Sequence, residues 1–127
     1  MRYGAEPERD LCELWRRIVF SIAVSNTDDH LRNHGFLLSN AGWRLSPAYD
    51  INPNSQGYGL SLNISESDNA LDFSLARQVA PDFRLSIREA ESILKKTTGT
   101  VSRWKTYANA VGIPRSDQET MQTAFRY

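Results

Sequence analysis

The sequence predicts a mainly α-helical protein with one small β-hairpin. Apolar residues recur at helical spacing near the N-terminus and again through the last third of the chain. Two short apolar runs, 36–39 and 43–45, flank Asn40-Ala41-Gly42, which is a hairpin turn signal. With 127 residues, of which 40% are hydrophobic, the chain can bury the core of a single domain. We therefore expect one domain over residues 1–127.

A long N-terminal helix is the first predicted element. Pro7 suits the first helical position, and Glu8 and Asp10 place acidic groups where the helix dipole favours them. We expect Arg16 and Arg17 at the solvated edge of this helix. Its apolar stripe predicts burial on more than one side. The stripe contains Leu11, Leu14, Trp15, Ile18, Val19, Ile22 and Ala23, widened by Cys12, Phe20 and Val24.

Further strand and helix signals follow the hairpin. Residues 60–65 alternate apolar and polar side chains, which predicts a half-buried strand or extended edge. Ser86 and Glu89 form a capping-box pattern that opens a helix, and we expect Gly99 to interrupt or kink that helix. A second capping box, 116–119, is expected to open the last helix. The apolar positions of these helices are Leu71, Leu75, Val79, Ala90, Ile93, Leu94, Val101, Trp104, Ala108, Val111, Met121, Ala124 and Phe125.

Charge and hydropathy exclude several classes of protein. Fifteen basic residues balance fifteen acidic ones, so net charge favours neither a nucleic-acid nor a membrane partner. No apolar run approaches the roughly 20 residues of a membrane span. The single cysteine, Cys12, excludes an internal disulfide and suits a reducing cytosol. We expect a cytoplasmic protein that contacts no membrane.

Ten consecutive residues, Asn26 to Gly35, are unusually polar. They contain two carboxylates, two imidazoles, a guanidinium and two carboxamides. A segment that only closes a turn needs one or two such groups. Because the stretch directly follows the long helix, a rigid element anchors it, which is how an active site is best held. This loop is the first candidate for chemistry.

Three residues have a spacing that suits phosphoryl transfer. That reaction needs an acceptor hydroxyl held in line and Mg²⁺ to neutralise the phosphates. A carboxylate at Asp28 can take the hydroxyl proton, and Asn33, five residues later, can return to the metal. Asp50, just beyond the predicted hairpin, can supply a further oxygen ligand, which a hard cation prefers. The same residues also admit a structural interpretation, in which they only cap turns and neighbouring elements.

At these positions the sequence resembles the C-terminal lobe of HipA-type serine/threonine kinases, the toxins of bacterial toxin–antitoxin pairs. The resemblance rests on Asn26-Thr27-Asp28-x-His30-x-Arg32-Asn33 and on Trp43-Arg44-Leu45-Ser46-Pro47-Ala48-Tyr49-Asp50. It implies a protein-kinase-like C-terminal lobe. In such a lobe Asp28 is the catalytic base, and Asn33 and Asp50 bind Mg²⁺ and, through it, ATP.

The resemblance also implies that His30 and Arg32 belong to the catalytic group. We expect His30 to hold the loop backbone rather than a metal. Arg32 contacts a phosphate or forms an ion pair with Asp29 or another loop acid, and the sequence leaves both roles open. Asp29 and His34 depart from the family pattern, and we expect His34 to be a surface or hydrogen-bonding residue.

The nucleotide-binding lobe of a kinase has no signature in this sequence. The chain lacks G-x-G-x-x-G and G-x-x-x-x-G-K-[ST], and residues 57–59, Gly-Tyr-Gly, follow the polar loop and are expected to be flexible linker. We therefore expect a C-terminal lobe alone, which is a fragment, a truncated gene product or half of a split kinase. The expected partners are a protein substrate and either an antitoxin or a separate N-terminal lobe chain, with nucleic acid contacted only indirectly. The lysines, Lys95, Lys96 and Lys105, lie in the predicted C-terminal helices.

Three other functions compete with this interpretation. The two histidines and Asn33 suggest a ββα-metal nuclease, but a long helix precedes the loop and no further His or CxxC completes a metal site. A degenerate kinase lobe would bind an antitoxin or DNA without catalysis. A small-molecule phosphotransferase would share the Asp28–Asn33 spacing, whereas residues 46–50 favour the HipA-like interpretation.

Overall fold

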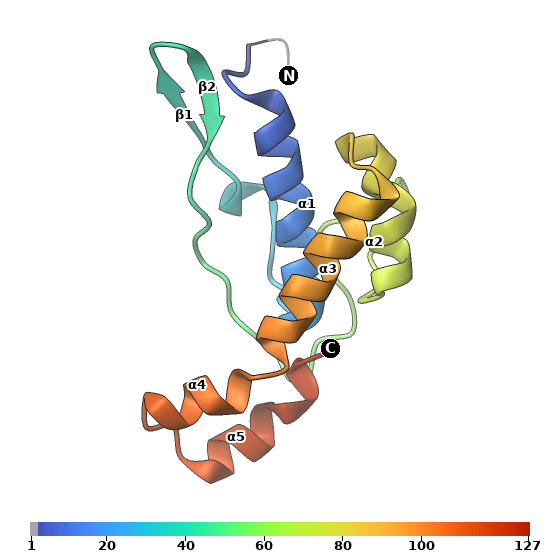
Figure 1. Ribbon diagram of the computed structural model, residues 1–127. Coiled ribbons are helices and arrows are strands. Elements are labelled where there is room, and N and C mark those ends of the chain that lie inside the picture. Colours follow the sequence, from blue (N-terminus) through green and yellow to red (C-terminus); the bar gives the residue numbers. More distant parts are fainter. Residues whose placement is uncertain (1–2) are drawn as a thin grey trace.

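The computed structural model describes residues 3–127 (Figure 1). The prediction of a mainly helical chain with one antiparallel hairpin is confirmed. No helix in this part of the chain is long and apolar enough to cross a membrane. With η marking a 3₁₀ turn, the elements are α1 (Pro7–Val24), η1 (Leu31–Asn33), β1 (Phe36–Ser39), β2 (Gly42–Leu45), α2 (Phe73–Val79), η2 (Ala80–Phe83), α3 (Ile87–Val101), α4 (Trp104–Ala110), α5 (Arg115–Met121) and η3 (Gln122–Ala124).

Helix α1 is the element around which the others are arranged. Figure 1 shows α3 running alongside it, the hairpin beside its first turns, and α4 and α5 grouped at the far end of α3. The predicted N-terminus is confirmed, with Pro7 in the first turn together with Glu8 and Asp10. Trp15 is fully buried, and its indole N–H donates to the Ala76 carbonyl oxygen at 2.9 Å. This bond ties α1 to α2.

The main hydrophobic core lies between α1, α2, α3 and the segment 60–64. A smaller cluster of Ala23, Val24 and Val101 joins the end of α1 to the end of α3. The last turn of α1, which leads into the polar loop, is therefore held by packing. The main core comprises Trp15, Val19, Ile22, Leu60, Ile64, Leu75, Ala76, Val79, Ala80, Ala90 and Leu94.

The hairpin is attached to the first half of α1. Ser39 pairs with Gly42, so residues 40–41 make the turn, and Gly42 has a φ of 124° that favours glycine. Asp10 of α1 is buried and accepts a hydrogen bond from the Leu45 N–H at 3.1 Å. Because a buried carboxylate needs such partners, α1 and β2 are fixed together.

Residues 60–65 form bends, so the prediction of a strand there is wrong. Leu60 and Ile64 are buried, which explains the apolar spacing. Their N–H groups, however, donate to the carbonyl oxygens of Asn69 at 2.9 Å and Asp68 at 2.7 Å. These local bonds turn the chain back on itself and leave no ladder for a neighbouring strand.

The predicted interruption of a helix at Gly99 and the predicted capping box at 116–119 are both wrong. Helix α3 continues through Gly99 to Val101 and ends where the Ser102 hydroxyl donates to the Gly99 carbonyl oxygen at 2.9 Å, competing with the backbone. Helix α5 begins at Arg115 without a side-chain cap. The Pro114 carbonyl oxygen accepts hydrogen bonds from the N–H groups of Asp117 and Gln118, so the expected capping box at 116–119 lies inside the helix.

The capping box at the start of α3 is confirmed. The Glu89 N–H donates to the Ser86 hydroxyl oxygen, and the Ser86 N–H donates to the Glu89 carboxylate. Hydrogen bonds from the Ser86 hydroxyl, and then from its backbone N–H, hold the pKa of Glu89 below its ordinary value. Both groups favour the charged carboxylate at the helix N-terminus.

Gly99→Ala is expected to raise the free energy of unfolding by about 0.5–1 kcal/mol, because glycine inside a helix is entropically unfavourable. A Cβ at position 99 would meet no atom within 4 Å. Urea unfolding followed by circular dichroism measures the change. Gly112→Ala is the control and should destabilise, because Gly112 has a φ of 78°. A loss of stability in Gly99→Ala would contradict an uninterrupted α3.

Candidate functional site

The polar loop begins where α1 ends in a left-handed residue. Ser25 has φ 53° and ψ 48°, and the Asn26 N–H donates to the Ser21 carbonyl oxygen at 2.8 Å. This arrangement turns the chain sharply away from the helix axis. The Asn26 side chain is buried, and its Nδ2 donates to the Ser21 hydroxyl at 3.4 Å. The first loop residues are therefore fixed to α1.

Residues near the end of the chain support this turn. The Ser25 hydroxyl donates to the Ala124 carbonyl oxygen at 2.6 Å, and Arg126 donates to the same hydroxyl oxygen through Nη1. The Arg126 N–H also donates to the Ala23 carbonyl oxygen at 2.7 Å. Sequence reasoning missed these contacts, because Ser25 and Ala124 are 99 residues apart and no local pattern joins them.

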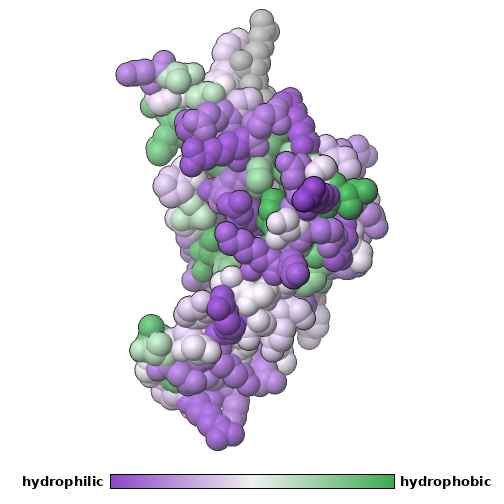
Figure 2. Space-filling model, viewed as in Figure 1, coloured by the Kyte–Doolittle hydropathy of each residue, from purple (hydrophilic) through white to green (hydrophobic). Residues whose placement is uncertain are grey.

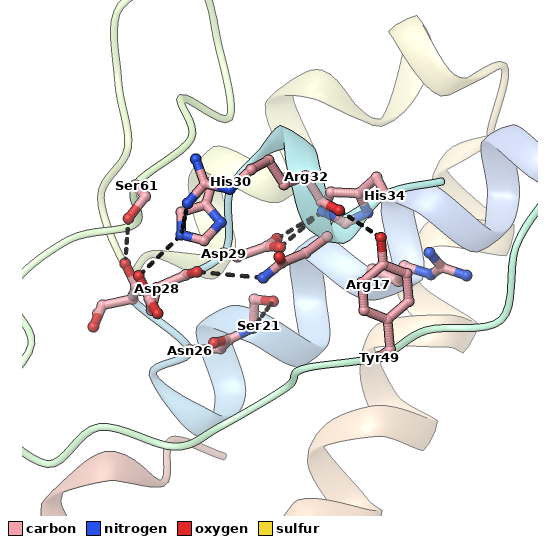
Figure 3. A network of polar contacts seen from close by, with 12 residues as sticks. Arg17, Ser21, Asn26, Asp28, Asp29, His30, Arg32, His34, Tyr49 and Ser61 are labelled. Carbon is pink, nitrogen blue, oxygen red and sulfur yellow. Dashed lines mark hydrogen bonds and ion pairs between the residues drawn. The ribbon is translucent and has the colours of Figure 1, made fainter. Parts of the chain in front are cut away.

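Asp28, His30 and Arg32 form a chain of polar contacts (Figure 3). Asp28 Oδ1 lies 3.2 Å from His30 Nε2, and Arg32 Nη2 lies 3.1 Å from the same nitrogen. One nitrogen of a neutral imidazole cannot both donate to Asp28 and accept from Arg32, so His30 serves one contact at a time. The Asp28 side chain is 82% exposed, which leaves its carboxylate accessible to a molecule in solution.

Asn33 occupies the buried side of the same turn. Its Nδ2 donates to the Asp28 carbonyl oxygen at 3.4 Å, and its backbone N–H donates to the His30 carbonyl oxygen at 2.8 Å. The second bond belongs to η1. The five-residue spacing therefore closes into a compact turn, with the Asp28 carboxylate outside and the Asn33 carboxamide inside.

The segment that follows the hairpin runs beside this loop. The Ser46 N–H donates to the Gly35 carbonyl oxygen at 2.8 Å, and the Tyr49 hydroxyl donates to the Arg32 carbonyl oxygen at 2.5 Å. Figure 3 shows the Tyr49 ring pointing toward the loop. Tertiary contacts thus bring the two parts of the predicted motif together.

Asp50 lies between these contacts and a further attachment at Asn54. The Asn54 N–H donates to the Ser25 carbonyl oxygen at 3.1 Å. Asp50 has a φ of 55°, a left-handed conformation that Asp tolerates better than most residues. Its Oδ1 accepts a hydrogen bond from Asn52 Nδ2 at 2.9 Å. The exposed Asp50 carboxylate therefore lies in an irregular segment that is attached to the loop on both sides, through Tyr49 and Asn54.

The structure gives Asp50 no hydrogen bond or ion pair with Asp28 or Asn33 among residues 3–127. In the same residues, no three or more His, Cys, Asp or Glu side chains are grouped to hold a metal ion. The predicted metal ligands, Asn33 and Asp50, offer one carboxamide and one carboxylate, and such oxygen donors suit Mg²⁺ by their chemistry. Their assignment to a metal stays a prediction.

Arg17 is buried, so its prediction as part of the solvated edge of α1 is wrong. Its Nη2 donates to the Ser46 carbonyl oxygen at 2.5 Å, which attaches the segment after the hairpin to α1. Arg16 is exposed, as predicted. Asp10, Arg17 and Ser21 are all buried and recur at intervals of seven and four residues. A polar stripe at helical spacing is ordinarily typical of a solvated face, so no local pattern in the sequence signals that Arg17 is buried.

Gly57 lies against Thr27, in the segment predicted to be flexible linker. A Cβ at Gly57 would lie 2.3 Å from Thr27 Cγ2 and 2.9 Å from its Cβ. The Thr27 carbonyl oxygen accepts a hydrogen bond from the Ser61 hydroxyl at 2.6 Å. Gly57 therefore packs onto the loop, whereas Tyr58 beside it is fully exposed.

Gly57→Ala is expected to lower the free energy of unfolding by about 1–3 kcal/mol, because the added methyl group overpacks the contact with Thr27. Thr27 is β-branched and cannot easily rotate away. Gly59→Ala is the matched control in chemical denaturation, since its Cβ would approach only the Asn69 side chain, at 3.3 Å. Equal losses in the two variants would contradict a specific contact at Gly57.

A family model described as the HipA-like C-terminal domain matches residues 1–105. The chain belongs to this family. Comparisons with curated proteins and with solved structures found no match.

In this HipA-like C-terminal domain, the matched region contains the polar loop, the hairpin and the segment after the hairpin that includes Asp50. Helix α5 and η3, which support the loop at Ser25, lie outside that region. Within the domain, α1 provides the rigid support. The polar loop provides an exposed carboxylate at Asp28, and the irregular segment 46–54 provides another at Asp50.

Proposed function

We propose that this chain is the catalytic lobe of a HipA-like serine/threonine kinase, which transfers the γ-phosphoryl group of ATP to a protein hydroxyl. The observation that carries the proposal is the turn from Asp28 to Asn33. It presents one exposed carboxylate, and it holds a carboxamide five residues later against the backbone of that same Asp28. Membership of the HipA-like family supports the same function.

In the proposed reaction Asp28 accepts the proton of the acceptor hydroxyl. The hydroxyl oxygen bonds to the γ-phosphorus, and the bond from that phosphorus to the bridging oxygen of ADP breaks. His30 contacts the Asp28 carboxylate and restrains it. Arg32 is exposed, and while His30 bonds to Asp28 the Arg32 guanidinium is left available to phosphate oxygens.

Asn33 and Asp50 would hold Mg²⁺ through a carboxamide and a carboxylate oxygen. When bound, Mg²⁺ neutralises charge on the phosphates. Other residues of this chain would keep these two ligands in place. Asn33 is buried under the loop, and Asp50 lies in an irregular segment attached to the loop through Tyr49 and Asn54.

We further propose that a nucleotide-binding lobe completes the ATP site, either in a longer form of the protein or on a separate chain. The position of Gly57 supports this proposal, because this glycine lies against Thr27 and follows the polar loop in the sequence, whereas a phosphate-binding loop would precede it. In this proposal the protein is cytoplasmic, and an antitoxin is its further partner.

Calorimetric titration of ATP, with and without Mg²⁺, tests the proposal. We expect magnesium-dependent binding that is weak in this chain alone, is strengthened by an added nucleotide-binding lobe, and is lost in Asp50→Asn. Asp82→Asn makes the same change at an exposed position in η2 and should leave binding intact. Binding that is insensitive to Asp50→Asn would contradict its metal role. A folded chain that binds no ATP even with the lobe would contradict the kinase function.

A further inference from the structure

A largely buried hydrogen-bonded pair lies within the polar loop. His34 Nε2 is 2.8 and 3.0 Å from the two carboxylate oxygens of Asp29, as the dashed lines in Figure 3 show. The two side chains are 17% and 16% exposed. A contact that is largely shielded from water is stronger than an ion pair on the surface. Asp29 is thus paired with His34 and not with Arg32, which the sequence had left open as its partner. Arg32 contacts His30 instead.

The hydrogen-bonded pair of Asp29 and His34 closes the same turn as the predicted catalytic residues. Asp29 directly follows Asp28, and His34 directly follows Asn33. Each end of the turn therefore carries one residue predicted for chemistry and one member of the pair. The hydrogen bond from Asn33 Nδ2 to the Asp28 carbonyl oxygen is long, at 3.4 Å, so it restrains the turn only weakly. The pair is the shorter contact across the turn.

We infer that Asp29 and His34 are positioning residues, which set the position of Asn33 relative to Asp28. The inference rests on the proposed function, because that position matters for chemistry only if both residues take part in phosphoryl transfer. A purely structural pair would stabilise the fold without controlling the turn. The two roles can be separated, because one concerns global stability and the other concerns local order.

Amide hydrogen exchange in this chain tests the control of the turn without any nucleotide. Asp29→Ala should speed exchange of the Asn33 amide by about tenfold or more, because that N–H donates to the His30 carbonyl oxygen inside the turn. The Val19 amide, in the buried part of α1, reports global unfolding, so its exchange should speed up only by the factor that the measured loss of stability accounts for, and by less than exchange at Asn33. If Asp29→Ala fails to fold, Asp29→Asn keeps the shape and one acceptor oxygen, and should show a smaller increase at Asn33.

The double variant Asp29→Ala/His34→Leu separates positioning from stability. Removing both partners leaves no unpaired polar group, so the double variant should recover most of the stability that Asp29→Ala loses. It should nevertheless keep the fast exchange at Asn33. Glu119→Ala breaks an exposed ion pair on α5 and should alter neither the free energy of unfolding nor the exchange rate of the Asn33 amide. Slow exchange at Asn33 in the double variant, or in Asp29→Ala, would overturn the inference.

A binding measurement links the turn to the proposed chemistry. In the form of the protein that binds Mg²⁺ and ATP, Asp29→Ala should weaken binding by about tenfold, as loss of a group that orients a metal ligand does. Glu119→Ala should bind as wild type. Absence of binding by the wild-type protein would contradict the proposed function, and the exchange data would still decide the role of the pair. Unchanged binding in Asp29→Ala would overturn the positioning role alone.

Discussion

Asp28→Asn is expected to reduce phosphoryl transfer by about 10²-fold or more in an enzyme complete enough to turn over, as loss of a positioned base does. The carboxamide has the shape of the carboxylate but cannot take the proton of the acceptor hydroxyl. Folding should be unchanged, because the Asp28 side chain is 82% exposed and its one ion-pair contact among residues 3–127 is with His30. Initial rates of phosphate transfer from ATP to a protein substrate measure the effect.

The matched control for this variant is again Asp82→Asn, which should keep wild-type rates. Circular dichroism and thermal unfolding of both variants establish that the folds are equivalent. Unchanged turnover in Asp28→Asn would contradict the assignment of the base. Equal loss in both variants would show that the effect does not depend on the position of the carboxylate.

Trp15→Ala is expected to lower the free energy of unfolding by about 3–5 kcal/mol, the range for removing a large aromatic side chain from a core. Trp15 is fully buried between α1 and α2, and its indole N–H satisfies the Ala76 carbonyl oxygen. The variant therefore leaves both a cavity and an unpaired acceptor. Because a typical domain is stable by about 5–15 kcal/mol, the loss should be visible as a large shift of the urea midpoint.

Trp43→Ala is the control for this variant. Trp43 is 45% exposed on β2, and its N–H and carbonyl groups, which bond to Tyr3 and Ala5, remain after the substitution. The loss should be clearly smaller than for Trp15→Ala. Trp15→Phe should fall between the two, because it keeps most of the buried area and loses only the hydrogen bond. Similar losses at positions 15 and 43 would contradict the placement of Trp15 in the core.

The elements predicted correctly are those that depend on near neighbours along the chain. The proline and acidic residues at the start of α1, its apolar spacing and the capping box at Ser86 all act within a few residues. The errors arose where another local group competed. At the end of α3 the Ser102 hydroxyl bonds to the Gly99 carbonyl oxygen, and at the start of α5 the Pro114 carbonyl oxygen accepts the first hydrogen bonds of the helix. At residues 60–65 the alternating apolar pattern correctly predicted buried side chains, but local hydrogen bonds bend the backbone and prevent a strand.

The candidate site could be located from the sequence, but its internal contacts could not. The polar content of residues 26–35 and the spacing of Asp28, Asn33 and Asp50 are visible in the sequence. The pairing of Asp29 with His34 is not, because a separation of five residues outside a regular element has no periodic signal. The burial of Arg17 was missed because it depends on a carbonyl oxygen 29 residues away, at Ser46.

By itself the sequence determined the long helix, the hairpin and the concentration of polar groups between them, because helix and turn preferences are set by neighbouring residues. Only the tertiary structure decided which side of the loop faces solvent. Contacts from Ser46, Tyr49 and Asn54, and from Ala124 near the end of the chain, hold the loop from several directions. The energies of these contacts depend on burial, and burial exists only once distant segments have packed together.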